Sequence, residues 1–214
     1  MDSSTMPETD HHHEVGVETF RLAVIIGSVR EGRVGDVVAD WFIRQVERRD
    51  ELDIDVIDLA EVDLPFGFER PAEPEPHDPA HAVSSAFTVR RRLDAADAYV
   101  VVTPEYHHTV MTALRRLADW HGRPWQAKPV GFVSYGGTTG GGYAVERLRP
   151  LFADLHAVPV REQVTLPYAW ELFHEDGSSR QPAECEEAAR AMLDQLAWWA
   201  VTLRRGRERH PYAA

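Results

Sequence analysis

The sequence predicts one α/β domain in which helices cover both faces of a parallel sheet. Five short apolar segments alternate with amphipathic segments at helical spacing. Several apolar segments lack the polar–apolar alternation of half-exposed strands, which is typical of parallel strands buried on both faces. A length of 214 residues suits a single domain with a full core. Together these observations predict a doubly wound α/β sandwich.

The predicted strands are short segments rich in valine and isoleucine, which favour extended backbone on a buried sheet. No internal repeat is visible, so each segment is interpreted as one strand of a single sheet. These strands are expected at residues 21–26, 54–59, 98–103, 129–134 and 157–164.

The segments between the strands carry apolar residues three and four positions apart, as helices packed against a sheet do. In the first segment Val34, Val38, Trp41 and Phe42 share one face. Helices are expected at residues 33–49, 80–94, 110–120, 141–155 and 182–204.

The last of these helices begins at Pro182, which suits a first helical turn. Its apolar stripe ends at Trp198 and Trp199. We interpret these tryptophans as packing or subunit-interface residues rather than as a stack for a ligand. The single Cys185 lies in the same segment and is expected to be a buried, inert thiol.

The folded domain is expected to span residues 20–205, between a mobile N-terminal tail, 1–19, and a C-terminal tail, 206–214. The first tail contains the tract His11–His13, which is either a solvated or vector-derived tract or a metal binder.

Two irregular stretches interrupt the alternation of strands and helices. Residues 64–82 are rich in proline and predict a long surface loop, of the kind that often binds a ligand or a subunit. Residues 166–182 follow the last strand and contain a turn signal at Asp176-Gly177.

The composition excludes several classes of protein. A net charge of −12 argues against a nucleic-acid partner, which needs a basic face. One cysteine excludes an internal disulfide framework and fits a reducing compartment. No apolar run reaches the length of a membrane span, and the N-terminus lacks a signal peptide, so we expect a cytoplasmic protein. Lys128 is the only lysine, a bias typical of GC-rich bacterial genes.

A glycine-bearing turn, GSVREGRVGD at residues 27–36, follows the first predicted strand and opens a helix. It is not a Walker A loop, because Arg33 and Val34 stand where lysine and serine or threonine are required. It also lacks the dinucleotide fingerprint, because Ser28 and Val29 follow the first glycine.

Backbone N–H groups at a helix N-terminus favour an anion. The Ser28 hydroxyl and the guanidinium groups of Arg30 and Arg33 add donors suited to phosphate oxygens. With no acidic residue at the expected ribose position, the loop suits a terminal monophosphate better than a pyrophosphate. The alternative is a plain turn with solvated arginines.

Two further loops follow predicted strands, and the carboxyl ends of parallel strands are where ligands bind in such sheets. In TPEYHHTV, residues 103–110, Pro104 fixes the backbone and Tyr106 offers a flat face. Glu105 is either an N-cap-like acceptor or a buried orienting carboxylate. His107 and His108 are adjacent and lack further ligands, so no metal site is predicted.

The third loop, residues 134–148, has five glycines among its first nine positions, which allow the backbone to approach a planar ligand closely. The alternative is a flexible linker. One ligand satisfies all three loops, namely a flat ring system whose side chain ends in one phosphate. That description predicts FMN.

The segments IIGSVREGRVG, DAYVVVTPEYHHTV, KPVGFVSYGGTTGGGYAVERLR and AWELFHEDG together resemble the NADPH-dependent FMN reductase family. The resemblance covers residues 21–204 and implies a flavodoxin-like three-layer sandwich with five parallel strands in the order 2-1-3-4-5. It implies noncovalently bound FMN, NADPH or NADH as co-substrate, and a homodimer or homotetramer.

The resemblance also implies roles for residues in each loop. The FMN phosphate is expected at Ser28, Arg30 and Arg33, near Val34 and Gly35. The ring is expected between two sets of residues, of which Tyr106 and His107 are also candidate catalytic residues: Pro104, Glu105, Tyr106 and His107 on one side, and Ser134, Tyr135, Gly136 and Gly137 on the other.

The chain departs from the family pattern in two places. His107 stands where the family usually has asparagine, and it either alters proton delivery and substrate choice or keeps one hydrogen bond. Met111-Thr112 and Arg115-Arg116 replace the usual Pro-Gly and Lys-Asn, while Asp119-Trp120 is retained.

The implied activity is two-step electron transfer, from reduced nicotinamide to bound FMN and then to a quinone, flavin, azo compound or related small acceptor. Three alternatives remain from the sequence. They are an FMN electron carrier without a nicotinamide site, a biosynthetic flavoenzyme that uses His107 or His108, and a protein that kept the fold and lost the cofactor.

Overall fold

The computed structural model describes residues 18–62, 85–120, 122–174, 178, 180 and 182–213. The predicted loop at 64–82, the turn at Asp176-Gly177 and the histidine tract of the N-terminal tail lie outside the described residues.

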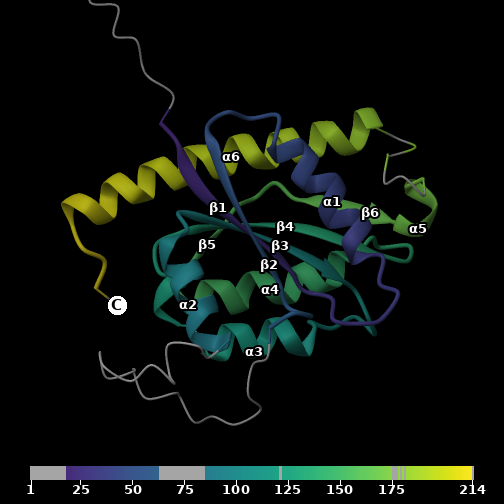
Figure 1. Ribbon diagram of the computed structural model, residues 1–214, viewed down its shortest axis with the longest axis horizontal. Coiled ribbons are helices and arrows are strands. Elements are labelled where there is room, and N and C mark those ends of the chain that lie inside the picture. Colours follow the sequence, from purple (N-terminus) through teal and green to yellow (C-terminus); the bar gives the residue numbers. More distant parts are fainter. Residues whose placement is uncertain are drawn as a thin grey trace, which may run out of the picture.

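The sheet is parallel throughout, with strand order β2-β1-β3-β4-β5 and β6 also paired with β4, which confirms the predicted flavodoxin-like order (Figure 1). Its strands are β1 (Phe20–Ile26), β2 (Leu52–Asp58), β3 (Ala98–Pro104), β4 (Pro129–Gly136), β5 (Val158–Pro159) and β6 (Val164–Pro167).

The predicted fifth strand, 157–164, was wrong as a single strand. The chain first pairs with β4 as the short strand β5, then leaves the sheet, and then pairs with β4 again as β6. The guanidinium of Arg149 donates to the carbonyls of Val160, at 2.6 Å, and Arg161, at 3.0 Å. These carbonyls are therefore satisfied by a helix side chain instead of a strand ladder.

Six α-helices and one 3-10 helix lie in the described residues: α1 (Gly35–Val46), α2 (Ser85–Ala95), α3 (Thr112–Trp120), η1 (Arg123–Trp125), α4 (Gly142–Asp154), α5 (Ala169–Leu172) and α6 (Pro182–Arg209). Helix α5 lies in a stretch expected to be irregular. Helix α6 continues five residues past the predicted end at residue 204. Its last turns are held by ion pairs from Arg204 and Arg207 to Asp97.

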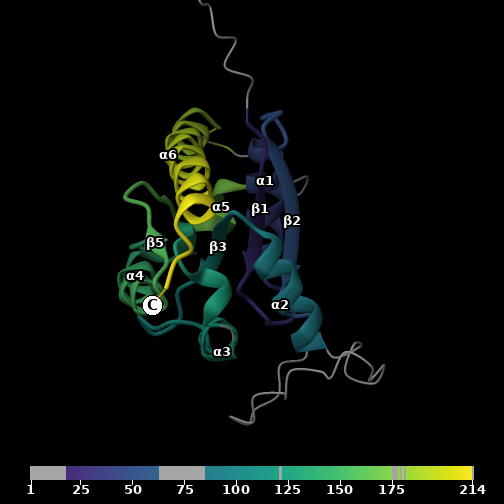
Figure 2. The same cartoon turned by 90° about the vertical axis from the view of Figure 1, so that its left-hand side faces the viewer.

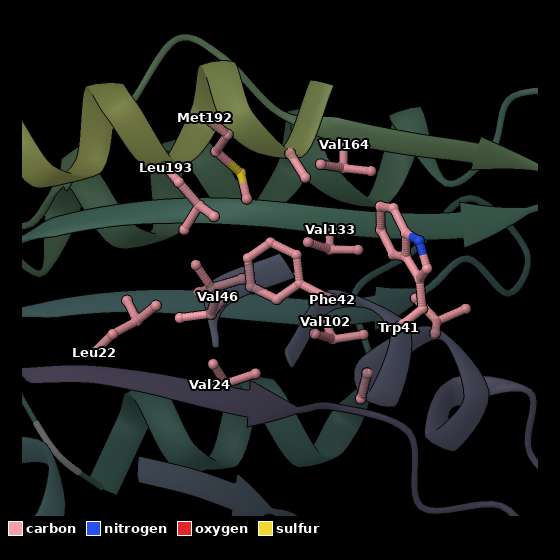
Figure 3. Close-up of a cluster of buried hydrophobic side chains, with 14 of the residues drawn as sticks. Leu22, Val24, Trp41, Phe42, Val46, Val102, Val133, Val164, Met192 and Leu193 are labelled. Carbon is pink, nitrogen blue, oxygen red and sulfur yellow. The ribbon is translucent and has the colours of Figure 1, made fainter. Parts of the chain in front are cut away.

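The sheet is buried between two helical layers (Figures 1 and 2). Helices α1 and α6 cover one face, and α2, α3 and α4 cover the other. Successive residues of β1 point to opposite faces, so Leu22 and Val24 pack under α1 and α6 while Ala23 and Ile25 pack on the other side. Figure 3 shows the first of these clusters, in which Phe42 of α1 meets the strands.

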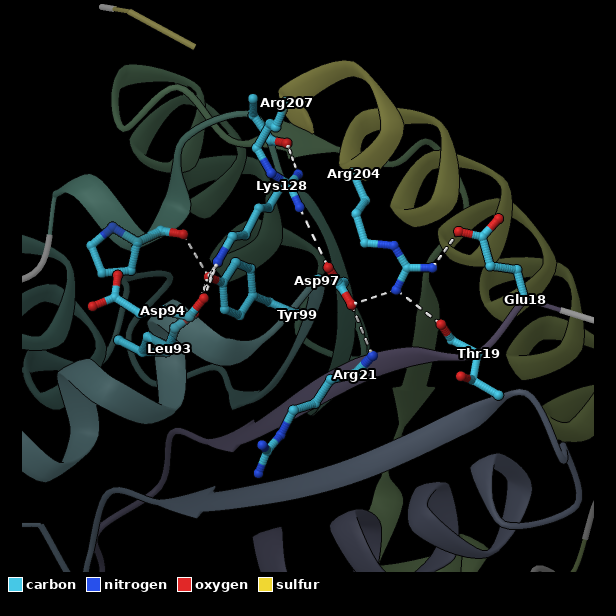
Figure 4. A network of polar contacts seen from close by, with 12 residues as sticks. Glu18, Thr19, Arg21, Leu93, Asp94, Asp97, Tyr99, Lys128, Arg204 and Arg207 are labelled. Carbon is cyan, nitrogen blue, oxygen red and sulfur yellow. Dashed lines mark hydrogen bonds and ion pairs between the residues drawn. The ribbon is translucent and has the colours of Figure 1, made fainter. Parts of the chain in front are cut away.

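A polar network lies at the amino ends of the strands, away from the three loops (Figure 4). Asp97 accepts the backbone N–H of Arg21 at 3.2 Å and Nη1 of Arg204 at 3.0 Å, which joins β1 to the end of α6. The Lys128 ammonium donates to the Asp94 carbonyl at 2.9 Å and to the Tyr99 hydroxyl at 3.2 Å. This network holds together the end of the sandwich that lies opposite the three loops.

Within the described part of the chain, no helix is both long and apolar enough to cross a lipid bilayer.

Candidate functional site

A cavity of about 400 Å³ lies at the carboxyl ends of the strands, where the loops after β1, β3 and β4 meet α5. This volume is in the range of pockets that hold a cofactor-sized molecule. Its lining residues are Arg30, Glu31, Gly32, Arg33, Val34, Pro104, Glu105, Tyr106, Tyr135, Gly136, Gly137 and Trp170. The three loops singled out in the sequence therefore form one concave site, as expected for a sheet of this type.

The start of α1 is packed tightly against β4. A Cβ at Gly35 would lie 2.6 Å from the Tyr135 hydroxyl and 3.3 Å from the Ser28 Cβ. Only glycine therefore leaves these groups in place. The predicted position Gly35 shapes the wall behind the cavity rather than lining it.

Two buried hydroxyls lie together behind this helix start. Neither Ser28 Oγ nor Tyr135 Oη makes a hydrogen bond of ordinary geometry within the described residues. Burial raises the pKa of the Tyr135 phenol, although the neighbouring Ser28 offsets part of the rise, so the phenol stays a neutral donor. Buried hydroxyls normally have partners, and two such donors beside a helix N-terminus fit the oxygens of a phosphate.

Arg33 is held by carboxylates on both sides. Its Nη1 and Nη2 contact Asp58 at 2.8 and 2.5 Å, and its Nε lies 2.7 Å from Asp36 Oδ1. Nη1 also donates to the carbonyl of Ser28 within the same loop. The hydrogen bonds that Arg33 donates to Asp58 and then to Asp36 raise the pKa of its guanidinium, which is charged at every physiological pH.

Arg30 has a different environment. It is exposed, and its guanidinium carbon lies 4.5 Å from the centroid of the Tyr106 ring, at a distance suited to a cation–π contact. Both residues line the cavity. Arg30 therefore presents a cation over the flat face that Tyr106 was predicted to offer.

Glu105 connects two of the loops. Its carboxylate accepts the backbone N–H of Tyr143 at 3.0 Å, the Thr139 hydroxyl at 3.1 Å and a hydrogen bond with His108 Nδ1 at 2.9 Å. Its side chain is 8% exposed although it lines the cavity. The Glu105 carboxylate therefore links the loop after β3 to the loop after β4.

A tight turn follows Tyr106. Thr109 donates its N–H to the Tyr106 carbonyl at 3.1 Å, and the two central residues, His107 and His108, have φ of 52° and 55°. Positive φ at both central positions defines a type I′ turn, which asparagine and glycine fill most easily. His107 therefore has a backbone conformation that asparagine adopts more easily than histidine.

The structure places most of the predicted residues at the cavity. Four of them do not line it: Ser28, Gly35, His107 and Ser134. His107 is exposed on the turn, so nothing in the geometry supports a catalytic role for it. Ser134 is fully buried and donates to the Val164 carbonyl at 3.4 Å, so its side chain serves the pairing of β4 with β6.

Three lining residues were not predicted: Glu31, Gly32 and Trp170. Trp170 of α5 is 55% exposed, and its ring meets that of Tyr168 edge to face, with centroids 5.6 Å apart. The sequence signal for Trp170 was a run of three aromatic residues, Tyr168, Trp170 and Phe173, directly after the last strand.

No group of three histidine, cysteine, aspartate or glutamate side chains in the described residues has the geometry of a metal site. The cavity is lined by guanidinium, carboxylate and aromatic side chains and by glycine backbone.

Comparison with known proteins identifies one family of flavin-dependent reductases. The family model described as NADPH-dependent FMN reductase matches residues 20–171. The chain is 29% identical to an NAD(P)H-dependent FMN reductase of Schizosaccharomyces pombe over 151 residues, which covers 70% of this chain and 74% of that protein. It is 27% identical to a probable NADPH:quinone oxidoreductase of rice over 209 residues, covering 95% of each.

Among solved structures, the flavoenzyme NAD(P)H:(acceptor) oxidoreductase FerB from Paracoccus denitrificans superposes with a TM-score of 0.68 at 19% identity. The superposition covers 86% of this chain and 98% of FerB. At this identity the likeness concerns the fold.

Proposed function

Given that the chain belongs to the NADPH-dependent FMN reductase family, we propose that it transfers electrons from NAD(P)H, through noncovalently held FMN, to a small aromatic acceptor such as a quinone. Membership makes it an FMN-dependent oxidoreductase that uses NAD(P)H. The acceptor class, the noncovalent mode and the residue roles below are our proposal.

One observation carries this proposal, namely that a cavity of cofactor size has flat or side-chain-free walls and lies beside two buried hydroxyls at the start of a helix. The buried hydroxyls of Ser28 and Tyr135 meet at the start of α1. Gly136 and Gly137 leave bare backbone on one wall, and Tyr106 lies on another. These features fit the phosphate and the ring system of FMN.

FMN, when bound, supplies the acceptance of a hydride and the onward transfer of electrons. The chain supplies position and charge. Glu105 fixes the β3 and β4 loops relative to each other through Thr139 and Tyr143. Arg30 contributes positive charge to the cavity, and Trp170 lines it with an exposed aromatic face that the planar ring of FMN can contact.

The decisive experiment is anaerobic addition of NADPH to the purified protein, with the visible spectrum recorded before and after. We expect the bands of oxidised flavin to bleach rapidly and to return on addition of a quinone. Bands that persist would instead support an electron carrier without a nicotinamide site, for which the net charge of −12 would suit a basic partner. A protein that holds no FMN, even when FMN is added, would refute the proposal.

The phosphate end of the site is tested separately by Arg30→Ala. We expect weaker retention of FMN in this variant, with unchanged retention in Arg147→Ala, which removes an exposed arginine from α4. Equal flavin occupancy in Arg30→Ala and the parent protein would remove Arg30 from the phosphate site.

A further inference from the structure

We propose that Arg33 is a positioning residue locked in place by Asp58, and that Arg30 alone is the arginine that meets the phosphate of FMN. This inference rests on the proposed function and corrects the simplest interpretation of the loop, in which both arginines bind phosphate. It assigns to the Arg33–Asp58 ion pair the task of shaping the loop before FMN arrives.

The hydrogen-bonding capacity of Arg33 is nearly used up within the protein. A guanidinium has five N–H donors. Four are committed, since Nε pairs with Asp36, Nη1 with the Ser28 carbonyl and with Asp58, and Nη2 with Asp58. One donor cannot make the two-pronged contact that gives arginine its strength toward phosphate. A direct phosphate bond of that kind would require Asp36 or Asp58 to give up its contact with the guanidinium.

The charges around Arg33 also argue against a direct contact with the phosphate. One guanidinium lies between two carboxylates, so Arg33, Asp36 and Asp58 together carry a net negative charge. Burial alone would raise the pKa of Asp58, but hydrogen bonds from Arg33 and from the Ala60 N–H hold that pKa below its ordinary value. Asp58 is therefore ionised at neutral pH. Such a cluster does not attract a dianion through its own net charge.

The Arg33–Asp58 ion pair, here called the brace, connects the loop to the neighbouring strand. Asp58 is the last residue of β2 and lies opposite Ile26, the last residue of β1, in the parallel ladder. Arg33 reaches back from the far end of the loop to Asp58 and to the Ser28 carbonyl. The side chains of Arg33 and Asp58 are only 11% and 15% exposed. The pair thus closes the loop and fixes the backbone that presents its N–H groups to an anion.

Arg30 is the complementary case. Within the described residues it has no carboxylate partner, and its contact is with the face of Tyr106. A surface guanidinium stacked on a ring keeps its N–H donors available at the ring's edge. Arg30 therefore has the free charge and the free donors that Arg33 lacks.

The test is whether the Kd for FMN rises or falls when Asp58 is neutralised. If Asp58 holds Arg33 as a brace, Asp58→Asn weakens FMN binding, and we expect the Kd to rise about tenfold. If Arg33 is a phosphate ligand that Asp58 restrains, the same variant frees Arg33 and the Kd falls. Tighter FMN binding by Asp58→Asn would overturn the inference.

Combined variants sharpen the result. In the Asp58→Asn background, we expect Arg33→Gln to add little further loss of FMN affinity, because the brace is already broken. Arg30→Ala should still remove affinity there, and it should remove the preference for FMN over riboflavin, which lacks the phosphate. A further large loss on Arg33→Gln in that background would identify Arg33 as a phosphate ligand and refute the brace.

The matched control is Asp55→Asn. Asp55 lies on β2 and pairs with Arg92 at 2.5 Å, and its side chain is 12% exposed, so the variant breaks a comparable ion pair away from the cavity. We expect its FMN affinity to equal that of the parent. Riboflavin binding and circular dichroism verify that each variant is folded. A parent protein that takes up no FMN refutes the proposed function as well, whereas tighter binding by Asp58→Asn alone refutes only this inference.

Discussion

Glu105 accepts the backbone N–H of Tyr143 at 3.0 Å, across 38 residues of sequence. Tyr143 is the second residue of α4, and the residue that precedes this helix, Gly141, has no side chain with which to cap it. A carboxylate from the β3 loop therefore does what an N-terminal capping residue normally does. The negative charge also lies at the positive end of the helix dipole.

We predict that Glu105→Ala lowers the free energy of unfolding by about 1–2 kcal/mol, because α4 loses its cap and the two loops lose their connection. Urea denaturation followed by circular dichroism measures the change. Glu146→Ala, at an exposed position of α4, is the control and should shift the midpoint very little. An equal effect of the two variants would show that Glu105 does not cap the helix.

We predict that His107→Asn raises the free energy of unfolding by about 0.5–1 kcal/mol, since His107 has φ of 52° and asparagine adopts this conformation more readily. FMN affinity should not change, because His107 does not line the cavity. Thermal melts and FMN titrations measure the two quantities, with His174→Asn as an exposed control outside the turn. A drop in FMN affinity would restore His107 to the binding site.

We predict a pH dependence of stability that comes from Lys128. Burial, and then the positive charge of Arg207, lower the pKa of its ammonium from 10.5 to about 8 in the folded protein. Below pH 8 the lysine is charged in both states, so the folded protein carries the whole free-energy penalty of burying it. Between pH 8 and 10.5 the unfolded chain binds more protons, so stability rises with pH by up to about 3 kcal/mol.

Lys128→Met removes this contribution and leaves the Leu93 and Asp94 carbonyls without their donor. The unfolding free energy of the parent, relative to the variant, should therefore climb as the pH is raised through that window. Denaturant midpoints at several pH values measure it, and Arg147→Met should run parallel to the parent. A constant difference between parent and Lys128→Met would contradict the lowered pKa.

We predict that Trp170→Ala weakens FMN binding about fivefold, as the loss of one aromatic contact of about 1 kcal/mol implies. Trp198 provides the control, because it is 61% exposed on α6 and does not line the cavity. Isothermal titration of each apoprotein with FMN gives both affinities. If the two variants bind equally well, Trp170 belongs to the acceptor or to another surface instead.

The sequence predicted the sheet well because its strands are fixed by local chemistry. Uninterrupted apolar runs such as AYVVVT and PVGFVS form strands buried on both faces, and turn residues mark their ends. The split between β5 and β6 was missed because it depends on Arg149, whose carbonyl partners lie 11 and 12 residues further along the chain. No local pattern records that contact.

The same limit applies to the site. The sequence placed Arg33 in the loop, but it could not show that Asp58, 25 residues away, would occupy its guanidinium. It indicated Tyr106 as a flat surface and Glu105 as an orienting group, since both follow directly from a proline-fixed strand end. It missed Trp170 because a single-turn helix of four residues is too short to leave a periodic pattern.

The chain has one lysine, and that side chain is 8% exposed beneath Tyr99 and the end of α6. An amine-acylating reagent therefore meets no accessible ε-amino group on the native protein. Acylation of Lys128 requires the surrounding helices to separate. The acylation rate, followed by peptide mass spectrometry, therefore reports how often the end of the sandwich opposite the three loops opens. The molecule thus carries its own single-site chemical reporter of partial unfolding, far from the cavity and independent of the flavin.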